Sequence, residues 1–438
     1  MKRFVRPGAF LLLAALLFCL SGCYSGNIDQ YFSLPMASEE YRQLQSLIDE
    51  ELASGSEYAA PIHGSYRQSV QLSDVDGDGA DEALAFFRDA AKNPKINIYD
   101  SENGEHRLAL SISGEGSSIG RIDYADLTGD GQKELLVSWQ ISSGLSVLGV
   151  YSLAGWSGDV LLSTDSAEFV TGDINRDGCD ELLNLRAANS TTYLVDQYTF
   201  PLGQEPQATS AALSAGISAL QRLRMVTLAG DAPALLAEST LTTGDLVSDL
   251  FVCRDGSLIN LTMNRTTQIS ETRRSYSLVF AQDIDGDGST EIPHPQQLYS
   301  RGDEVFWSIA WFRYDASGRA STIMTTYHCV TDNWYLVLPS GWDVGLTVRR
   351  DDSVSGERAV ILSRLRSDGS LEDYVAVYAI TGENRYERAR LDNRFLLQEE
   401  GTTVYAAKIL DGKTDENTIR SRFHVIYTDW SSGSVVGG

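Results

Sequence analysis

The chain has 438 residues, enough for one large repeat fold or roughly two to three ordinary domains, and its formal net charge is −25. This excess of carboxylates argues against binding nucleic acid or an anionic membrane surface, because both require patches of Lys and Arg. Of the five cysteines, only Cys179, Cys253 and Cys329 follow position 23, so at most one disulfide can form there and a disulfide framework is excluded.

Residues 1–22 have the pattern of a secretory signal peptide. Basic residues open the chain, and residues 9–20 form an apolar run, too short for a membrane-spanning helix of about 20 residues. The following Leu20-Ser21-Gly22-Cys23 resembles the lipobox of bacterial lipoproteins. That resemblance implies cleavage before Cys23, lipidation of its thiol and anchoring to the outer face of the cell membrane, or to the outer membrane in a Gram-negative cell. The alternative is an ordinary secreted protein with a chance cysteine.

Residues 23–65 are expected to form a lipidated tether and one amphipathic helix. The helix is predicted over 38–53, where Ser38 can cap the start and apolar side chains recur on one face. These apolar side chains are Tyr41, Leu44, Leu47, Ile48 and Leu52. This apolar face predicts that the helix packs on the main domain or forms part of a stalk.

Residues 66–432 are dominated by a repeat. The pattern Asp-x-Asp/Asn/Thr-x-Asp-Gly-x-x-Glu occurs in loops 1 to 4, which are residues 74–82, 126–134, 173–181 and 283–291. A decayed copy around Gly230 and Asp231 has Thr227 and Ala229 where oxygen ligands would be expected. Counting it, the copies start 52, 47, 54 and 56 residues apart. Such a period indicates a repeat architecture.

Short β-rich runs flank each loop, and two more fit before the next loop. Four short strands in about 50 residues is the spacing of a propeller blade. The chain is therefore predicted to be all-β, a β-propeller of seven blades of four-stranded antiparallel sheets with a short N-terminal helix. Residues 433–438 are expected to be a flexible tail.

The loops have the composition of calcium sites. Calcium takes six to eight oxygen ligands, and positions 1, 3, 5 and 9 of each loop can supply side-chain oxygens around a curled backbone. The glycine at position 6 permits the positive φ that continues the curl. The predicted ligands are Asp74, Asp76, Asp78, Glu82, Asp126, Thr128, Asp130, Glu134, Asp173, Asn175, Asp177, Glu181, Asp283, Asp285, Asp287 and Glu291. With full sets of carboxylates, loops 1 and 4 are expected to bind calcium most tightly.

Two other interpretations of the loops are weaker. An EF-hand closes with an acidic residue at position 12 and continues into a helix, whereas these loops have Ala85, Val137, Asn184 and His294 there, and β-rich runs follow. Asp-Gly is also a common hairpin turn, but four copies with one nine-residue spacing favour a metal site.

The loops and their period resemble the FG-GAP and VCBS repeats of integrin α-chains and many bacterial surface proteins. The resemblance is good over about residues 66–300 and weak beyond. It implies that each calcium loop joins the first two strands of a blade, with ligands at positions 1, 3, 5 and 9. It also implies surface recognition of an extracellular protein or glycan without identifying the ligand. Thr128 and Asn175 depart from the pattern but can offer neutral oxygens, with lower expected affinity.

No group of residues predicts catalysis. The histidines are scattered, and Gly116-Ser-Ser118-Ile-Gly120 has the letters of a hydrolase nucleophile elbow without the helix that must follow it. Aromatic residues crowd positions 307–342 and could bind sugars, although blade cores also use them. The sequence thus favours a calcium-binding, lipid-anchored binding or scaffold module. The alternative is an extracytoplasmic propeller hydrolase or lyase acting on glycans or phosphoesters.

Cys23→Ala should leave an unprocessed precursor or a soluble product, because the lipid is attached at that thiol. Intact-mass analysis of the membrane fraction measures this, with Cys179→Ala as the control that keeps the lipid. An unmodified Cys23, or cleavage elsewhere, would contradict the lipoprotein interpretation.

Overall fold

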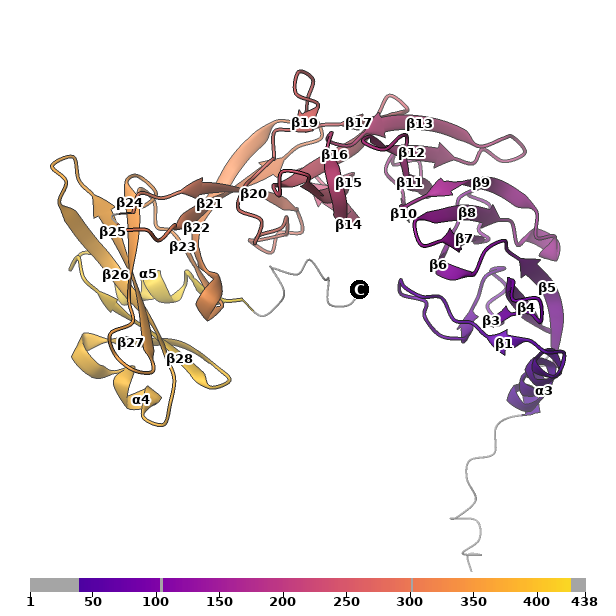
Figure 1. The fold of residues 1–438 in the computed structure, drawn as a ribbon, viewed down its shortest axis with the longest axis horizontal. Helices are drawn as coiled ribbons and strands as arrows, with labels where there is room; N and C mark the ends of the chain where they lie inside the picture. Colours follow the sequence, from indigo (N-terminus) through magenta and orange to yellow (C-terminus); the bar gives the residue numbers. More distant parts are fainter. Residues whose placement is uncertain (1–38, 103–104, 301, 427–438) are drawn as a thin grey trace, which may run out of the picture.

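The computed structural model describes residues 39–102, 105–300 and 302–426 (Figure 1). The predicted signal peptide, Cys23, residues 23–38 of the tether and the tail 433–438 lie outside them. In the described part of the chain, no helix combines the length and apolar character needed to cross a membrane.

The N-terminal helix is α3 (Glu39–Ala53), which confirms the helix predicted over 38–53. Its Leu44 and Ile48 are buried against the first sheet, so the helix packs on the main domain. Tyr41 was expected on this face, but its side chain is 53% exposed, because the helix contacts the sheet through its middle and last turns.

Six antiparallel sheets of four or five strands succeed one another along the described chain, together with one two-stranded sheet. Sheet 1 contains β1 (Glu57–Tyr58), β2 (Val70–Ser73), β3 (Glu82–Arg88), β4 (Pro94–Glu102) and β5 (Glu105–Ser113). Sheet 2 contains β6 (Ser118–Ala125), β7 (Glu134–Ser142), β8 (Leu145–Tyr151) and β9 (Val160–Ser166). Sheet 3 contains β10 (Glu168–Gly172), β11 (Glu181–Ala187), β12 (Tyr193–Thr199) and β13 (Gln207–Ala212).

The C-terminal half continues the series of sheets. Sheet 4 contains β14 (Ile217–Leu228), β15 (Ala232–Leu241), β16 (Leu246–Arg254) and β17 (Ser257–Asn260). The two-stranded sheet pairs β18 (Met263–Asn264) with β19 (Ile269–Ser270). Sheet 5 contains β20 (Glu291–Gln297), β21 (Trp307–Tyr314), β22 (Ala320–Cys329), β23 (Trp334–Val337) and β29 (Phe423–Val425). Sheet 6 contains β24 (Leu346–Asp351), β25 (Glu357–Leu365), β26 (Leu371–Ile380), β27 (Phe395–Glu400) and β28 (Thr403–Ile409).

The predicted all-β, propeller-type architecture is confirmed, with a difference in the number of blades. Six sheets of blade size stand where seven were expected. The reason is that sheets 5 and 6 share residues 291–425 and have five strands each, so they use more chain than the period of the N-terminal repeats.

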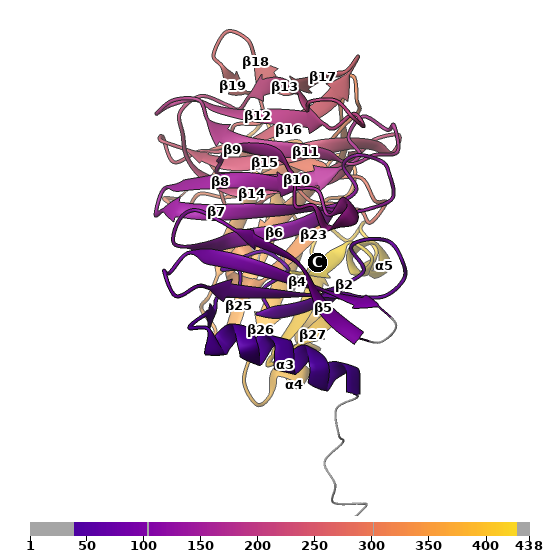
Figure 2. The ribbon, with the colours of Figure 1, turned by 90° about the vertical axis from the view of Figure 1, so that its right-hand side faces the viewer.

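The sheets are arranged around an arc, with the first strands of sheets 2 to 4 on its concave side (Figures 1 and 2). One hydrophobic core fills the space between each successive pair of sheets. The inner strands are apolar on both faces, as in β7, where Leu135 joins the core shared with sheet 1 and Leu136 the core shared with sheet 3. Side chains alternate between faces along a strand, so such runs require a sheet on either side.

Helices cover the outer faces at the two ends of the arc (Figure 1). At one end α3 covers sheet 1. At the other, α4 (Arg385–Arg388) leads into Ala389, which packs on Ile380 and Ala406 of sheet 6. After α5 (Glu416–Arg420), β29 returns to pair with β23 of sheet 5. Within the described residues, no strand pair joins sheet 1 to sheet 6, so the ends are covered rather than joined.

Ile48→Ala should destabilise the protein by roughly 2–4 kcal/mol, because it removes apolar volume between α3 and sheet 1. Urea denaturation measures this loss. The control is Ile62→Ala, whose parent side chain is 51% exposed, and which should change stability little. Equal small changes for the two variants would show that α3 does not stabilise the end of the arc.

Candidate metal-binding loops

Loops 1 to 3 each connect two neighbouring strands of a sheet, as the family resemblance implies. Loop 1 lies between β2 and β3, loop 2 between β6 and β7, and loop 3 between β10 and β11. Loop 4 runs directly into β20, and only an isolated bridge, Gln282 with Glu291, stands in for the preceding strand. In every loop the glutamate at position 9 is the first residue of the following strand, so the sheet itself positions that carboxylate.

All four loops are built on one hydrogen-bond pattern. The position 1 carboxylate accepts from the amides of positions 4 and 6; in loop 1, Gly77 and Gly79 donate to Asp74 at 2.8 and 3.2 Å. The position 5 carboxylate accepts from the amide of position 7, as Asp78 does from Ala80 at 2.7 Å. The equivalent bonds recur in loops 2, 3 and 4. The pattern curls the aspartates inward.

The curl also depends on positive φ angles at positions 4 and 6. Gly77 and Gly79 have φ values of 80° and 90°, which glycine adopts without steric cost. In loop 3, Arg176 adopts φ 66° at position 4, a conformation that L-residues rarely take.

The closing glutamates are buried. Glu82, Glu134, Glu181 and Glu291 are at most 3% exposed, and each accepts a hydrogen bond from the amide of position 2 at 2.9–3.1 Å. Burial, reinforced by the neighbouring aspartates, raises the pKa of Glu82, Glu134 and Glu181 to about 7. A buried carboxylate is stable when it is protonated or paired with a cation.

The side-chain oxygens of loop 1 are arranged in a way that fits a cation. Oε1 of Glu82 is buried and has no hydrogen-bond partner. Oxygens of Asp74, Asp76 and Asp78 lie within 4.8 Å of one another, and those of Asp76, Glu82 and Asp100 form a second such group. Hard carboxylate oxygens at this spacing match the preference of calcium.

Loops 2 and 3 carry a neutral group at position 3. In loop 2, the Thr128 hydroxyl lies 3.5 Å from Glu134, and both residues line a cavity of about 310 Å³ with Asp130. In loop 3, the Asn175 amide donates to Asp177 at 2.9 Å and to Glu181 at 2.6 Å. Both loops keep three carboxylates at the predicted ligand positions, one fewer than loop 1.

Loop 4 differs because a side chain already supplies a positive charge. The Arg313 guanidinium forms ion pairs with Asp285 at 2.8 Å, Asp287 at 2.8 Å and Glu291 at 2.7 Å. One arginine therefore binds three of the four predicted ligands of this loop. The repeat pattern did not reveal this interaction, because Arg313 lies outside the loop.

The decayed copy forms a tight hairpin between β14 and β15. The strands pair as far as Leu228 and Ala232, and Gly230 and Asp231 turn the chain with φ values of 74° and 56°. The nine-residue loop is therefore missing here, and the expectation that this copy binds no ion stays a prediction.

Neighbouring loops are joined to one another. The Lys133 amide donates to the Val75 carbonyl at 3.2 Å, and its ammonium group donates to the Asp74 carbonyl at 3.0 Å. The Asp180 amide donates to the Asp126 carbonyl at 3.3 Å. A Cβ on Gly129 would lie 2.5 Å from the Cys179 sulfur, so loops 2 and 3 are also in close contact. Each loop thus links its own sheet to the next.

The remaining sequence motifs take structural roles. Ser118 begins strand β6 rather than preceding a helix, so the residues 116–120 do not form a nucleophile elbow. Of the crowded aromatics, Trp311, Tyr327, Trp334, Tyr335 and Trp342 are buried, which confirms the core interpretation for them. Cys179, Cys253 and Cys329 are all free thiols.

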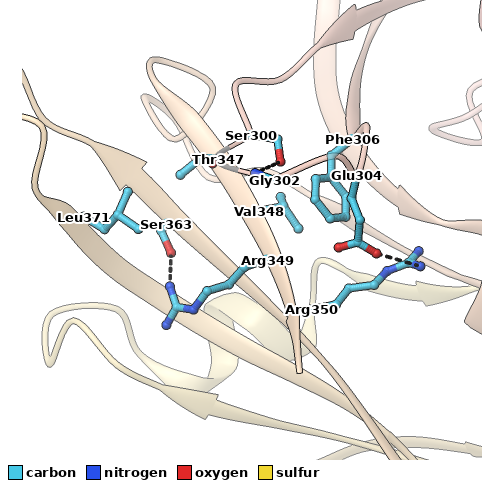
Figure 3. Close-up of a pocket in the computed structure, with 10 residues that line it drawn as sticks. All are labelled: Ser300, Gly302, Glu304, Phe306, Thr347, Val348, Arg349, Arg350, Ser363 and Leu371. Atoms are coloured by element: carbon cyan, nitrogen blue, oxygen red, sulfur yellow. Dashed lines mark hydrogen bonds and ion pairs between the residues drawn. The ribbon is translucent and has the colours of Figure 1, made fainter. Parts of the chain in front are cut away.

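A hollow away from the loops lies between sheets 5 and 6 (Figure 3). The Arg349 guanidinium is held by both oxygens of Asp373 at 2.7 and 2.6 Å and by Ser363 at 3.0 Å. Arg350 lies 4.0 Å from Glu304 and over the ring of Phe306. Both arginines of this hollow are thus paired with carboxylates, Arg349 within sheet 6 and Arg350 with the segment that precedes β21.

Comparison with known proteins adds little to these observations. No family model matches the chain, and no curated protein matches it. Two solved structures, from Bacteroides uniformis and Bacteroides fragilis, are each provisionally named a 6-phosphogluconolactonase. The match to the first structure has 12% sequence identity, spans 73% of this chain and 94% of that structure's chain, and has a TM-score of 0.28. The match to the second has 11% identity, spans 73% of this chain and 92% of that chain, and has a TM-score of 0.27. These TM-scores are too low to carry an argument about function.

In excess chelator, the melting temperature should fall between pH 5 and pH 8. The folded protein raises the pKa of Glu82 from 4.5 to about 7, so the associated stability is complete below pH 4.5 and is lost as the pH rises through 7. Glu82→Gln imitates the protonated side chain, so the variant should gain stability relative to the parent as the pH rises. Differential scanning calorimetry measures both proteins. A melting-temperature difference that is independent of pH would rule out this titration.

Proposed function

We propose that the chain is a calcium-binding, lipid-anchored binding or scaffold module of the FG-GAP/VCBS-repeat kind, displayed outside the cytoplasm. The observation that carries the calcium part is the buried, unpartnered Oε1 of Glu82 among the aspartates of loop 1. The hydrogen-bond pattern of the same loop recurs in loops 2 and 3, which supports a common role for these three loops.

The ions would be held by positions 1, 3, 5 and 9 of the loops. Calcium would supply two positive charges to each group of carboxylates and remove their mutual repulsion. The chain itself positions the ligands: the backbone amides of each loop orient its aspartates, and the following strand holds its closing glutamate. Because the loops also contact neighbouring sheets, a bound ion would stiffen the junctions of the arc.

The proposed location follows from the lipobox and from calcium supply. Extracellular calcium modules typically have Kd values of about 10⁻⁴–10⁻³ M, which suit calcium levels outside the cytoplasm. The membrane would be contacted through the Cys23 lipid, and the acidic surface does not suit nucleic acid. The partner is proposed to be an extracellular protein or glycan held by the module.

The alternative, a hydrolase or lyase acting on glycans or phosphoesters, requires acid, base or nucleophilic groups that converge on a substrate. In the hollow between sheets 5 and 6, Arg349 and Arg350 are instead paired with carboxylates. We therefore favour the binding or scaffold module.

The melting temperature should fall when chelator is added and recover with calcium, with magnesium much less effective because it requires near-ideal octahedral geometry. At about ten times Kd, each independent site should stabilise the fold by roughly 1.4 kcal/mol. Differential scanning calorimetry with elemental analysis measures both effects.

Asp76→Asn should weaken this response, because it removes a charged ligand from loop 1. The matched control is Asp231→Asn in the decayed copy, which should leave the response unchanged. An unchanged melting curve in excess chelator, with no calcium found in the protein, would reduce the loops to ordinary turns.

A further inference from the structure

One residue faces the closing glutamate of each loop from the next strand of the same sheet. In sheet 5 the antiparallel register pairs Glu291 with Arg313. Continuing the registers of sheets 1, 2 and 3 by one residue places Asp100, Ser152 and Thr199 opposite the other closing glutamates. We name these four residues the facing residues. They differ in charge although the loops they face share one pattern.

The facing residue of loop 4 reaches three different carboxylates. Nη2, Nη1 and Nε of Arg313 contact Asp285, Asp287 and Glu291 respectively, all within 2.8 Å. The arginine side chain is 19% exposed and Glu291 is fully buried, so water screens the innermost pair poorly. A guanidinium stays protonated at all ordinary pH values, and its planar fork suits several carboxylates at once.

The other facing residues leave their loops without a built-in cation. Ser152 lines the same cavity as Thr128 and Glu134 of loop 2, and it is neutral, as is Thr199 at loop 3. Asp100 brings a further carboxylate within 4.8 Å of Asp76 and Glu82. Asp100 forms an ion pair at 2.8 Å with Arg107 of β5, whose side chain is 59% exposed.

We infer that Arg313 takes the place of calcium in loop 4, so that this loop is held by a fixed internal cation while loops 1 to 3 take the metal. The facing residue decides between the two outcomes, because a guanidinium and a calcium ion would claim the same carboxylate oxygens. The assignment of metal to loops 1 to 3 rests on the proposed function, whereas the role of Arg313 in loop 4 does not.

The test uses the full chain, purified in detergent, with Arg313→Thr, which gives loop 4 the type of facing residue found in loop 3. Isothermal titration calorimetry and elemental analysis count the bound calcium. The variant should bind one calcium ion more than the parent. The matched control is Arg319→Thr, an exposed arginine in the hairpin after β21, which should bind the parental number. Equal numbers for parent and Arg313→Thr would overturn the inference.

A second pair of variants tests the same point without relying on the fold of Arg313→Thr. Asp285→Asn in loop 4 should leave the calcium count of the parent unchanged, whereas Asp76→Asn in loop 1 should lower it by one. A loss of one ion with Asp285→Asn would show that Arg313 moves aside for metal and would overturn the inference.

Measurements in excess chelator separate this inference from the proposed function. There, Arg313→Thr should melt below the parent, and Arg313→Lys should recover part of the loss, because a cation again faces Glu291. If no protein binds calcium but this order of melting temperatures holds, the proposed function fails and the role of Arg313 stands. If Arg313→Thr melts with the parent in chelator, the role of Arg313 is overturned.

Discussion

The structure depends on the accommodation of one buried carboxylate in each metal-type loop, that of the glutamate at the start of the following strand. Glu82, Glu134, Glu181 and Glu291 each occupy that place, and each accepts a backbone hydrogen bond that fixes the entry of its loop. An ionised carboxylate without a cation is costly in such surroundings. Protonation, a bound metal ion or a facing arginine can each remove the cost. Loop 4 uses the arginine, whereas burial and the neighbouring aspartates raise the pKa of the other three closing glutamates to about 7.

The same loops connect the sheets, so their electrostatics and the stability of the arc are coupled. Side chains at position 2, such as Val75 and Leu127, are buried in the cores between sheets, while the preceding aspartates accept hydrogen bonds from amides of the loop. Lys133 bonds from loop 2 to two carbonyl groups of loop 1. The backbones of loops 1 and 2 are therefore joined directly.

The ends of the arc present a different physical problem. An inner sheet buries both faces against its neighbours, whereas in the described part of the chain sheets 1 and 6 each share a core with only one other sheet. Helix α3 covers the exposed apolar face of sheet 1, and α4 with its following Ala389 covers part of sheet 6. This is how repeat proteins protect terminal units that would otherwise leave apolar surface in water.

Local pattern alone determined much of this protein. The period of the loops and the spacing of apolar side chains predicted the all-β architecture, the strands on either side of loops 1 to 3 and the helix over 38–53, because these depend on residues close together in the chain. Loops 1 and 4 have the same residues at positions 1, 3, 5 and 9, which predicted equal chemistry for them. Only the tertiary structure distinguished the two, since Arg313 is 22 positions beyond Glu291 and meets it through strand pairing.

The blade number was likewise decided by long-range pairing, because β29 joins a sheet whose other strands end almost 90 residues earlier. Charge partners and sheet membership are set across strands, and neighbouring sequence positions do not record them.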